Sequence, residues 1–169
     1  MNDNLKKSVI TAYEFCDKLD NTLFGVKQYG MTARKTLELE LLRYILWLAR
    51  LDSEITEQEL QVIKDYLDIE FSREEANKIA GKVVEDRKKV MTIPLILQRA
   101  VMLDNFMYDN GRSCEWCTVA EWLVSLYDAV GEEVINSKGY VLECEVRGYE
   151  VYHMLLKEYM KNRLCKEKE

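Results

Sequence analysis

Apolar residues recur three and four positions apart along almost the whole chain, and no segment shows the alternation of a half-buried strand. Residues at this spacing share one face of a helix, which is normally buried against the rest of the protein. The pattern predicts helices over residues 5–24, 32–51, 56–68, 72–84, 92–110, 115–130 and 142–163. We therefore expect an all-α fold of seven or so helices.

Several of these helices begin with residues that satisfy the free backbone N–H groups of a first turn. Thr56-Glu57-Gln58-Glu59 has the spacing of a capping box, and Ser72-Arg73-Glu74-Glu75 repeats it. Thr32 is a plausible N-cap for the helix over 32–51. That helix is apolar around most of its circumference, which predicts a central place in the core. Gly131 is expected to end the helix over 115–130.

The chain of 169 residues, with 48% hydrophobic and 32% charged residues, has the size and composition of one globular domain. No Pro-rich or Gly/Ser-rich linker divides it. We expect a single domain over 1–169, with an N-terminal helix and connection over 1–30, a core over 31–165 and a frayed tail over 166–169.

Charge, hydropathy and cysteine content limit the classes of partner and the cellular locations to be expected. A net charge of −6 argues against binding of nucleic acid. The densest apolar run, residues 44–49, is far shorter than the roughly 20 residues that span a bilayer. The start of the chain lacks the pattern of a signal peptide, so the five cysteines indicate reduced thiols and a cytoplasmic protein.

His153 is the one histidine of the chain, which excludes a histidine-rich zinc site and leaves a single imidazole for any catalytic dyad. It falls on an apolar helical stripe, where a core position with one hydrogen bond is expected. Cys114 and Cys117 form a lone Cys-x-x-Cys pair without the further ligands of a zinc site, so we expect structural cysteines, with redox use as the alternative. Arg87-Lys88-Lys89 is expected to be solvated at a helix end.

A faint internal repeat links residues 51–60 to residues 137–146, at an offset of 86 positions. The first of these segments, Leu48-Ala49-Arg50-Leu51-Asp52-Ser53-Glu54-Ile55-Thr56-Glu57-Gln58-Glu59-Leu60, resembles the TerB-like (tellurite-resistance B) superfamily. Ser53 stands where that family prefers Gly. In the second turn Gly139 is kept, but Lys138 replaces the acid and Leu142 replaces the capping hydroxyl.

The resemblance implies an all-helical domain with two related halves, covering most of residues 30–165. It further implies a bacterial protein linked to tellurite resistance or another stress response, which acts as a non-enzymatic adaptor and in some proposals binds metal ions.

The acidic turn of this segment has two interpretations. Asp52, Glu54, Glu57 and Glu59 supply carboxylate oxygens, which suit Ca²⁺ or Mg²⁺. Carboxylates at a helix start also complement its dipole and its capping box, and Asp52 is the residue least explained in that way.

Tyrosines gather in the last third of the chain. Tyr149, Tyr152 and Tyr159 cover a broad arc of the last predicted helix and suit either a helix–helix core or an interface with a partner or a second copy of the chain.

Three functional hypotheses follow. The leading one is a cytoplasmic, non-enzymatic helical module that binds another protein. The second is a divalent-metal-binding stress sensor that uses residues 52–59. The third is an immunity or antitoxin-like protein that neutralises a basic partner, for which the net charge of −6 is favourable.

Overall fold

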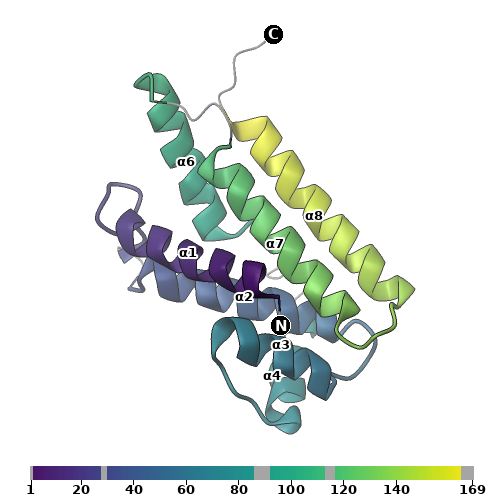
Figure 1. Cartoon of the computed structure of the whole chain (residues 1–169). Coiled ribbons are helices and arrows are strands. Elements are labelled where there is room, and N and C mark those ends of the chain that lie inside the picture. The colour runs from purple at the N-terminus through teal and green to yellow at the C-terminus, as the bar shows by residue number, and fades with distance from the viewer. Residues whose placement is uncertain (1, 28–29, 86–91, 113–116, 165–169) are drawn as a thin grey trace.

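The computed structural model of the chain describes residues 2–27, 30–85, 92–112 and 117–164, which form seven helices and no strand (Figure 1). The helices are α1 (Asp3–Leu19), α2 (Ala33–Ala49), α3 (Glu57–Leu67), α4 (Arg73–Glu85), α6 (Leu95–Asp109), α7 (Val119–Asn136) and α8 (Glu143–Arg163). The prediction of an all-α fold is confirmed. None of the described helices is long and apolar enough to cross a membrane.

The predicted caps are present. Thr32 accepts a hydrogen bond from the backbone N–H of Lys35 at the start of α2. Thr56 and Glu59 form the capping box of α3. The backbone N–H and the hydroxyl of Ser72 both donate to Glu75, at 3.0 and 2.7 Å. These reciprocal bonds satisfy donors that a helix start otherwise leaves open, which explains why the helices begin where the sequence predicts.

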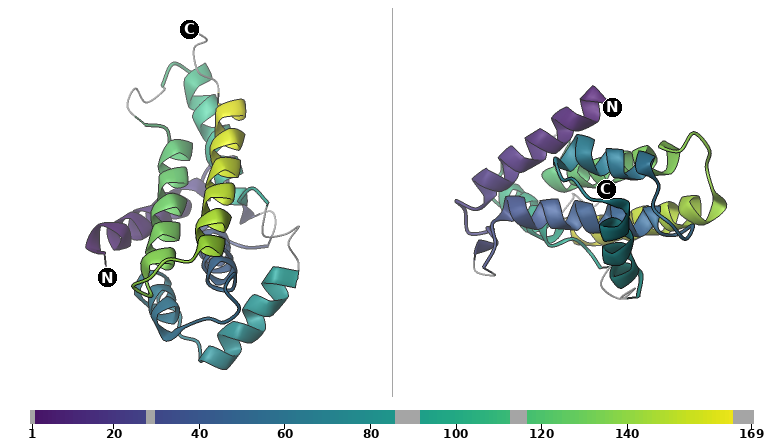
Figure 2. Two further views of the ribbon diagram at one scale, coloured as in Figure 1. Left: turned by 90° about the vertical axis from the view of Figure 1, so that its right-hand side faces the viewer. Right: turned by 90° about the horizontal axis from the view of Figure 1, so that it is seen from below.

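Helix α2 is the centre of the fold, because it packs against each of the other six described helices. Helices α6, α7 and α8 lie side by side, α1 and α2 cross them, and α3 and α4 lie together at one end (Figures 1 and 2). The fully buried side chains Leu37, Leu41 and Ile45 of α2 meet Leu123 and Tyr127 of α7 in this core. The expectation that the helix over 32–51 is central is confirmed.

The positions of the helices reproduce the offset of the sequence repeat. Helices α2 and α7 begin at residues 33 and 119, and α3 and α8 begin at residues 57 and 143. Both pairs are 86 positions apart, the separation of Asp52 from Lys138. Thr32 and Thr118 are also 86 positions apart in the sequence, and both are N-caps. The order α1–α2–α3 therefore has a counterpart in α6–α7–α8, with α4 between the two halves.

An aspartate from the preceding helix supports the start of each central helix as well: Asp20 is the C-cap of α1, and Asp104 lies within α6. Asp20 accepts hydrogen bonds from the backbone of Val26 and of Ala33, the first residue of α2. Asp104 of α6 accepts hydrogen bonds from the backbone of Val119 and Ala120, the first two residues of α7. Both halves thus join their first two helices through a carboxylate at a helix N-terminus, where the dipole favours negative charge.

Several predicted boundaries were wrong. Helix α1 ends at Leu19 rather than near residue 24, and α7 continues through Gly131 to Asn136. Gly131 is buried, and a Cβ atom there would lie 2.3 Å from the Tyr44 hydroxyl and 2.6 Å from the Tyr149 ring. This glycine therefore permits close helix packing and does not end the helix. Ile79 shares the helical spacing of Ala76 and Ala80, which predicts an inward position; Ala76 and Ala80 are fully buried, but Ile79 is 37% exposed. The tail over 166–169 lies outside the described residues.

Candidate functional site

One lysine side chain is buried among three carboxylates where the two halves of the chain meet. The side chain of Lys138 is 1% exposed, and its Nζ lies 2.6 Å from Asp52 Oδ2, 2.7 Å from Glu145 Oε1 and 3.4 Å from Glu59 Oε1. Glu59 and Glu145 are fully buried. We refer to Asp52, Glu59, Lys138 and Glu145 as the Lys138 cluster.

The repeat places these four side chains together. Asp52 lies in the connection from α2 to α3, and Lys138 lies at the equivalent place in the connection from α7 to α8; Figure 1 shows the two connections at the same end of the molecule. Each is followed by a residue with positive φ, Ser53 at 103° and Gly139 at 75°. Glu59 and Glu145 are the third residues of α3 and α8. Each half therefore supplies one turn residue and one glutamate.

Ser53 adopts its left-handed backbone without the glycine that this conformation favours. A non-glycine residue held there is strained and persists because its surroundings fix it. The ion pair of Asp52, the preceding residue, with buried Lys138 is one such constraint. The strained backbone at Ser53 thus lies next to the residue that the Lys138 cluster holds in place.

The electrostatics of the cluster favour a charged lysine. Burial by itself lowers the pKa of Lys138, but the hydrogen bonds with Asp52 and Glu145 and the charge of Glu59 raise it well above its ordinary value. Burial raises the pKa of Glu59, against the hydrogen bonds from Thr56 and the charge of Lys138. Lys138 is thus an ammonium cation at neutral pH, surrounded by more carboxylates than its own charge balances.

The structure divides the four predicted metal-binding residues. Asp52 and Glu59 lie in the Lys138 cluster. Glu54 is exposed and pairs with Arg73 at 2.9 Å, and Glu57 is exposed in the first turn of α3. Among the described residues, no group of three or more His, Cys, Asp or Glu side chains is placed to hold a metal ion. The sequence repeat pairs Asp52 with Lys138 and raises the question of whether Asp52, Glu57 and Lys138 converge; the structure brings Lys138 to Asp52 but leaves Glu57 exposed. Sequence reasoning missed Glu145, although it lies 86 positions after Glu59, the separation of Lys138 from Asp52.

The three predicted interface tyrosines differ in exposure. Tyr152 is 4% exposed and packs against Tyr44, with ring centroids 4.8 Å apart. Tyr149 and Tyr159 are partly buried and pack against the core. Tyr152 is therefore a core residue, consistent with the core-packing interpretation, whereas Tyr149 and Tyr159 keep some surface available to a partner.

His153 lies beside a carboxylate on the neighbouring helix. Its Nδ1 is 2.9 Å from Asp128 Oδ1 of α7, and the Tyr149 hydroxyl donates to the same oxygen. Partial burial lowers the pKa of His153, against the charge of Asp128, and the nearby Lys157 lowers it further. The imidazole is partly buried and stacks on Tyr149 of the same helix, with ring centroids 5.9 Å apart.

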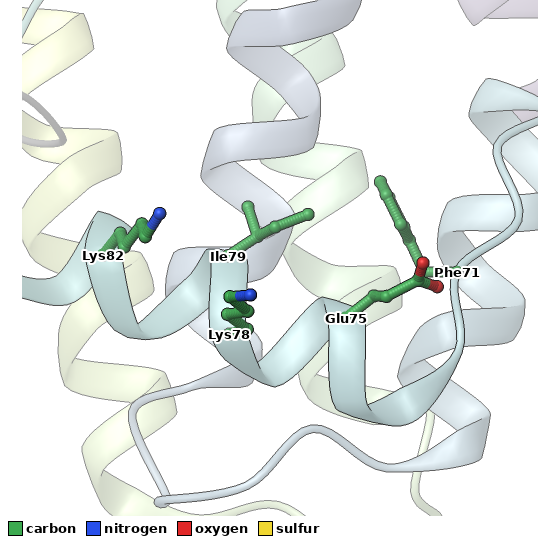
Figure 3. Close-up of a pocket in the computed structure, with 5 residues that line it drawn as sticks. All are labelled: Phe71, Glu75, Lys78, Ile79 and Lys82. Carbon is green, nitrogen blue, oxygen red and sulfur yellow. The ribbon is translucent and has the colours of Figure 1, made fainter.

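The cysteine pair, the basic segment and a surface pocket give weaker evidence of a functional site. Cys117 is exposed and precedes the N-cap Thr118, so it lies outside the first turn of α7. Cys114 and the segment Arg87-Lys88-Lys89 lie outside the described residues. Figure 3 shows a surface pocket of about 270 Å³ along α4, lined by Phe71, Glu75, Lys78, Ile79 and Lys82. This volume is below the ~300–1,000 Å³ typical of ligand sites, so we assign it no ligand.

We compared the chain with protein-family models, with curated proteins and with solved structures, and found no match in any of the three comparisons. No known protein therefore bears on the TerB-like resemblance, which remains a prediction from the sequence.

Proposed function

We propose that this protein is a non-enzymatic helical module that acts by binding another protein. The supporting observation is a set of exposed or half-buried apolar side chains where the connection after α1 meets α6. Phe24 and Phe106 contact each other with ring centroids 5.6 Å apart. Leu23 beside Phe24 is 92% exposed, Phe106 is 49% exposed, and Met102, one turn before Phe106 on α6, is 48% exposed. We refer to Leu23, Phe24, Met102 and Phe106 as the α6 edge.

The chemistry of the α6 edge suits a protein partner. Aromatic residues and methionine are enriched at the centres of protein interfaces, where they bury large apolar areas. Phe106 and Met102 project from a helix that packs against α2 and α7, so their positions are set before a partner arrives. A prepositioned apolar surface loses less conformational entropy on binding than a flexible one.

The finer parts of the proposal come from the sequence. The resemblance of residues 48–60 to TerB-like proteins supports a link to tellurite or chemical stress, and the reduced state expected for the cysteines supports a cytoplasmic location. The net charge of −6 makes a basic surface on the partner favourable. We do not propose a metal sensor, because Lys138 lies between the carboxylates that would bind the ion.

Affinity capture with matched variants tests the proposal. Met102→Glu places a charge in the α6 edge, and Met154→Glu is its control, since Met154 of α8 is 58% exposed and outside the edge. Both variants should keep the circular dichroism of the wild type. We expect one protein to be recovered with the wild type and with Met154→Glu, and at least tenfold less of it with Met102→Glu.

Equal recovery by both variants would contradict a role for the α6 edge. A small molecule turned over by the purified chain would contradict the non-enzymatic assignment. Sedimentation equilibrium identifies a second copy of the chain as the partner if association depends on concentration and is lost in Met102→Glu.

A further inference from the structure

We infer that the ammonium group of Lys138 is the resident cation of a carboxylate site shared by the two halves of the chain. It stands in the place of the divalent metal ion that the carboxylates of the acidic turn would suit. This inference concerns the stability of the fold and does not depend on the proposed partner-binding function.

The residues present do not fit a divalent ion while Lys138 is in place. The distances of 2.6 and 2.7 Å from its Nζ to Asp52 and Glu145 are those of charge-assisted hydrogen bonds. An ammonium group has three donors and no lone pair, so it cannot act as a ligand. A metal ion bound by the same carboxylates would also be repelled by the charge of Lys138 at close range.

The repeat shows what the lysine replaces. Lys138 lies 86 positions after Asp52 and bonds to it directly, so two equivalent turn positions meet at one point. With an acid at both positions, four buried carboxylates would converge and would need an external cation. With one acid and one lysine, the chain carries its own cation on a covalent tether. The junction between the halves therefore holds at any concentration of free Ca²⁺ or Mg²⁺.

The hydrogen bonds of the six carboxylate oxygens support a cation site. Lys138 donates to one oxygen of Asp52 and one of Glu145, and Thr56 donates to Glu59 Oε2. The other three oxygens, Asp52 Oδ1, Glu59 Oε1 and Glu145 Oε2, are buried and accept no hydrogen bond. A single ammonium cannot satisfy six oxygens, whereas Ca²⁺ accepts six to eight oxygen ligands. With Lys138 present, these carboxylates are not placed to hold a metal ion. Removal of the lysine should let them close around a divalent ion.

Thermal unfolding of the Lys138→Ala variant, with and without calcium chloride or magnesium chloride, tests the inference. The wild-type Tm should not change with either salt beyond the effect of ionic strength. Without a divalent ion, the Tm of Lys138→Ala should fall by about 10 °C, because three buried carboxylates lose their cation. Calcium should raise this Tm in a saturable way. Magnesium should raise it less, because Mg²⁺ requires shorter bonds and a stricter octahedron.

Two control variants separate this site from general charge effects. Lys138→Ala combined with Glu145→Gln should lose the response to calcium. Lys64→Ala removes an exposed ion pair with Glu70 and should show neither the fall in Tm nor the response. A Lys138→Ala variant as stable as the wild type, or destabilised but unresponsive to calcium, would overturn the inference. So would calorimetric calcium binding by the wild type that is lost in Asp52→Asn.

If Lys138→Ala does not fold in either buffer, the wild type decides the question by NMR of ¹⁵N-labelled lysine. One ammonium resonance should exchange slowly with water and lose that protection in Glu145→Gln. The absence of any protected lysine ammonium in the wild type would overturn the inference.

Discussion

The substitution Glu40→Gln should remove a pH dependence of stability that originates between α2 and α6. The carboxylate of Glu40 accepts hydrogen bonds from the backbone N–H groups of Leu95 and Ile96, at 2.5 and 3.4 Å, at the start of α6. Pro94 is the N-cap residue of α6 and makes no side-chain cap bond, so Glu40 supplies that function from another helix. Burial raises the pKa of Glu40 to about 7, against these hydrogen bonds.

The direction of the effect follows from proton linkage. The ordinary pKa of this carboxyl is 4.5, so between pH 4.5 and about 7 the folded protein holds its proton more tightly than the unfolded chain does. The contribution of Glu40 to stability is therefore greatest below pH 4.5 and is lost as the pH rises to about 7. At about 1.4 kcal/mol for each unit between the two pKa values, the loss is about 3 kcal/mol as an upper limit.

Urea unfolding of the wild type and of Glu40→Gln at pH 4.5, 6 and 8 measures this contribution. Other groups titrate in the same range, but they contribute equally to both proteins and cancel in the difference. The free energy of unfolding of the wild type, relative to that of the variant, should fall from pH 4.5 to pH 8 by up to about 3 kcal/mol. A difference that stays constant with pH would show that Glu40 does not titrate as its surroundings imply.

Substitutions at three further positions test the packing and caps by urea unfolding at neutral pH. Gly131→Ala should cost about 1–3 kcal/mol, because its Cβ would lie 2.3 Å from the Tyr44 hydroxyl. Gly81→Ala, in a helix with open space around the new Cβ, should instead gain up to about 1 kcal/mol; a loss equal to that at Gly131 would contradict the packing argument. Thr118→Ala should cost about 1 kcal/mol, since it removes the α7 capping box, while Thr118→Ser should be nearly neutral; equal losses would contradict the cap.

The helix starts could be predicted from the sequence because their signals are local. A hydroxyl and a glutamate three residues later bind the free backbone N–H groups of a helix start, as at Thr56 and Ser72. These bonds do not depend on the rest of the chain. The central place of α2 was predictable for a similar reason, since a helix that is apolar around most of its surface must be buried on most of it.

The sequence alone could not show that the helix predicted to end at Gly131 continues beyond it. Glycine both ends helices and lets neighbouring side chains approach closely, and only the positions of Tyr44 and Tyr149 distinguish the two uses. Ile79 was misplaced for a comparable reason, because helical spacing predicts which residues share a face but not how much of that face a neighbour covers.

The candidate site was predictable only in part. Local sequence indicated that Asp52 was not needed as a cap, and it assigned Glu59 to a capping box that the structure confirms. The burial of Glu59 and its proximity to Glu145 depend on how the two halves pack, which no local pattern encodes. The repeat offset contained the missing information, since it pairs Asp52 with Lys138.

The bond between Asp52 and Lys138 joins the two halves of the chain, and a double-mutant cycle measures its strength directly. Urea unfolding of the wild type, Asp52→Asn, Lys138→Met and the double variant yields the coupling free energy between the two side chains. We predict a favourable coupling of about 2 kcal/mol, within the range found for residues in one buried ion network. Additive effects, with a coupling below about 0.5 kcal/mol, would contradict the claim that Lys138 is the cation joining the two halves.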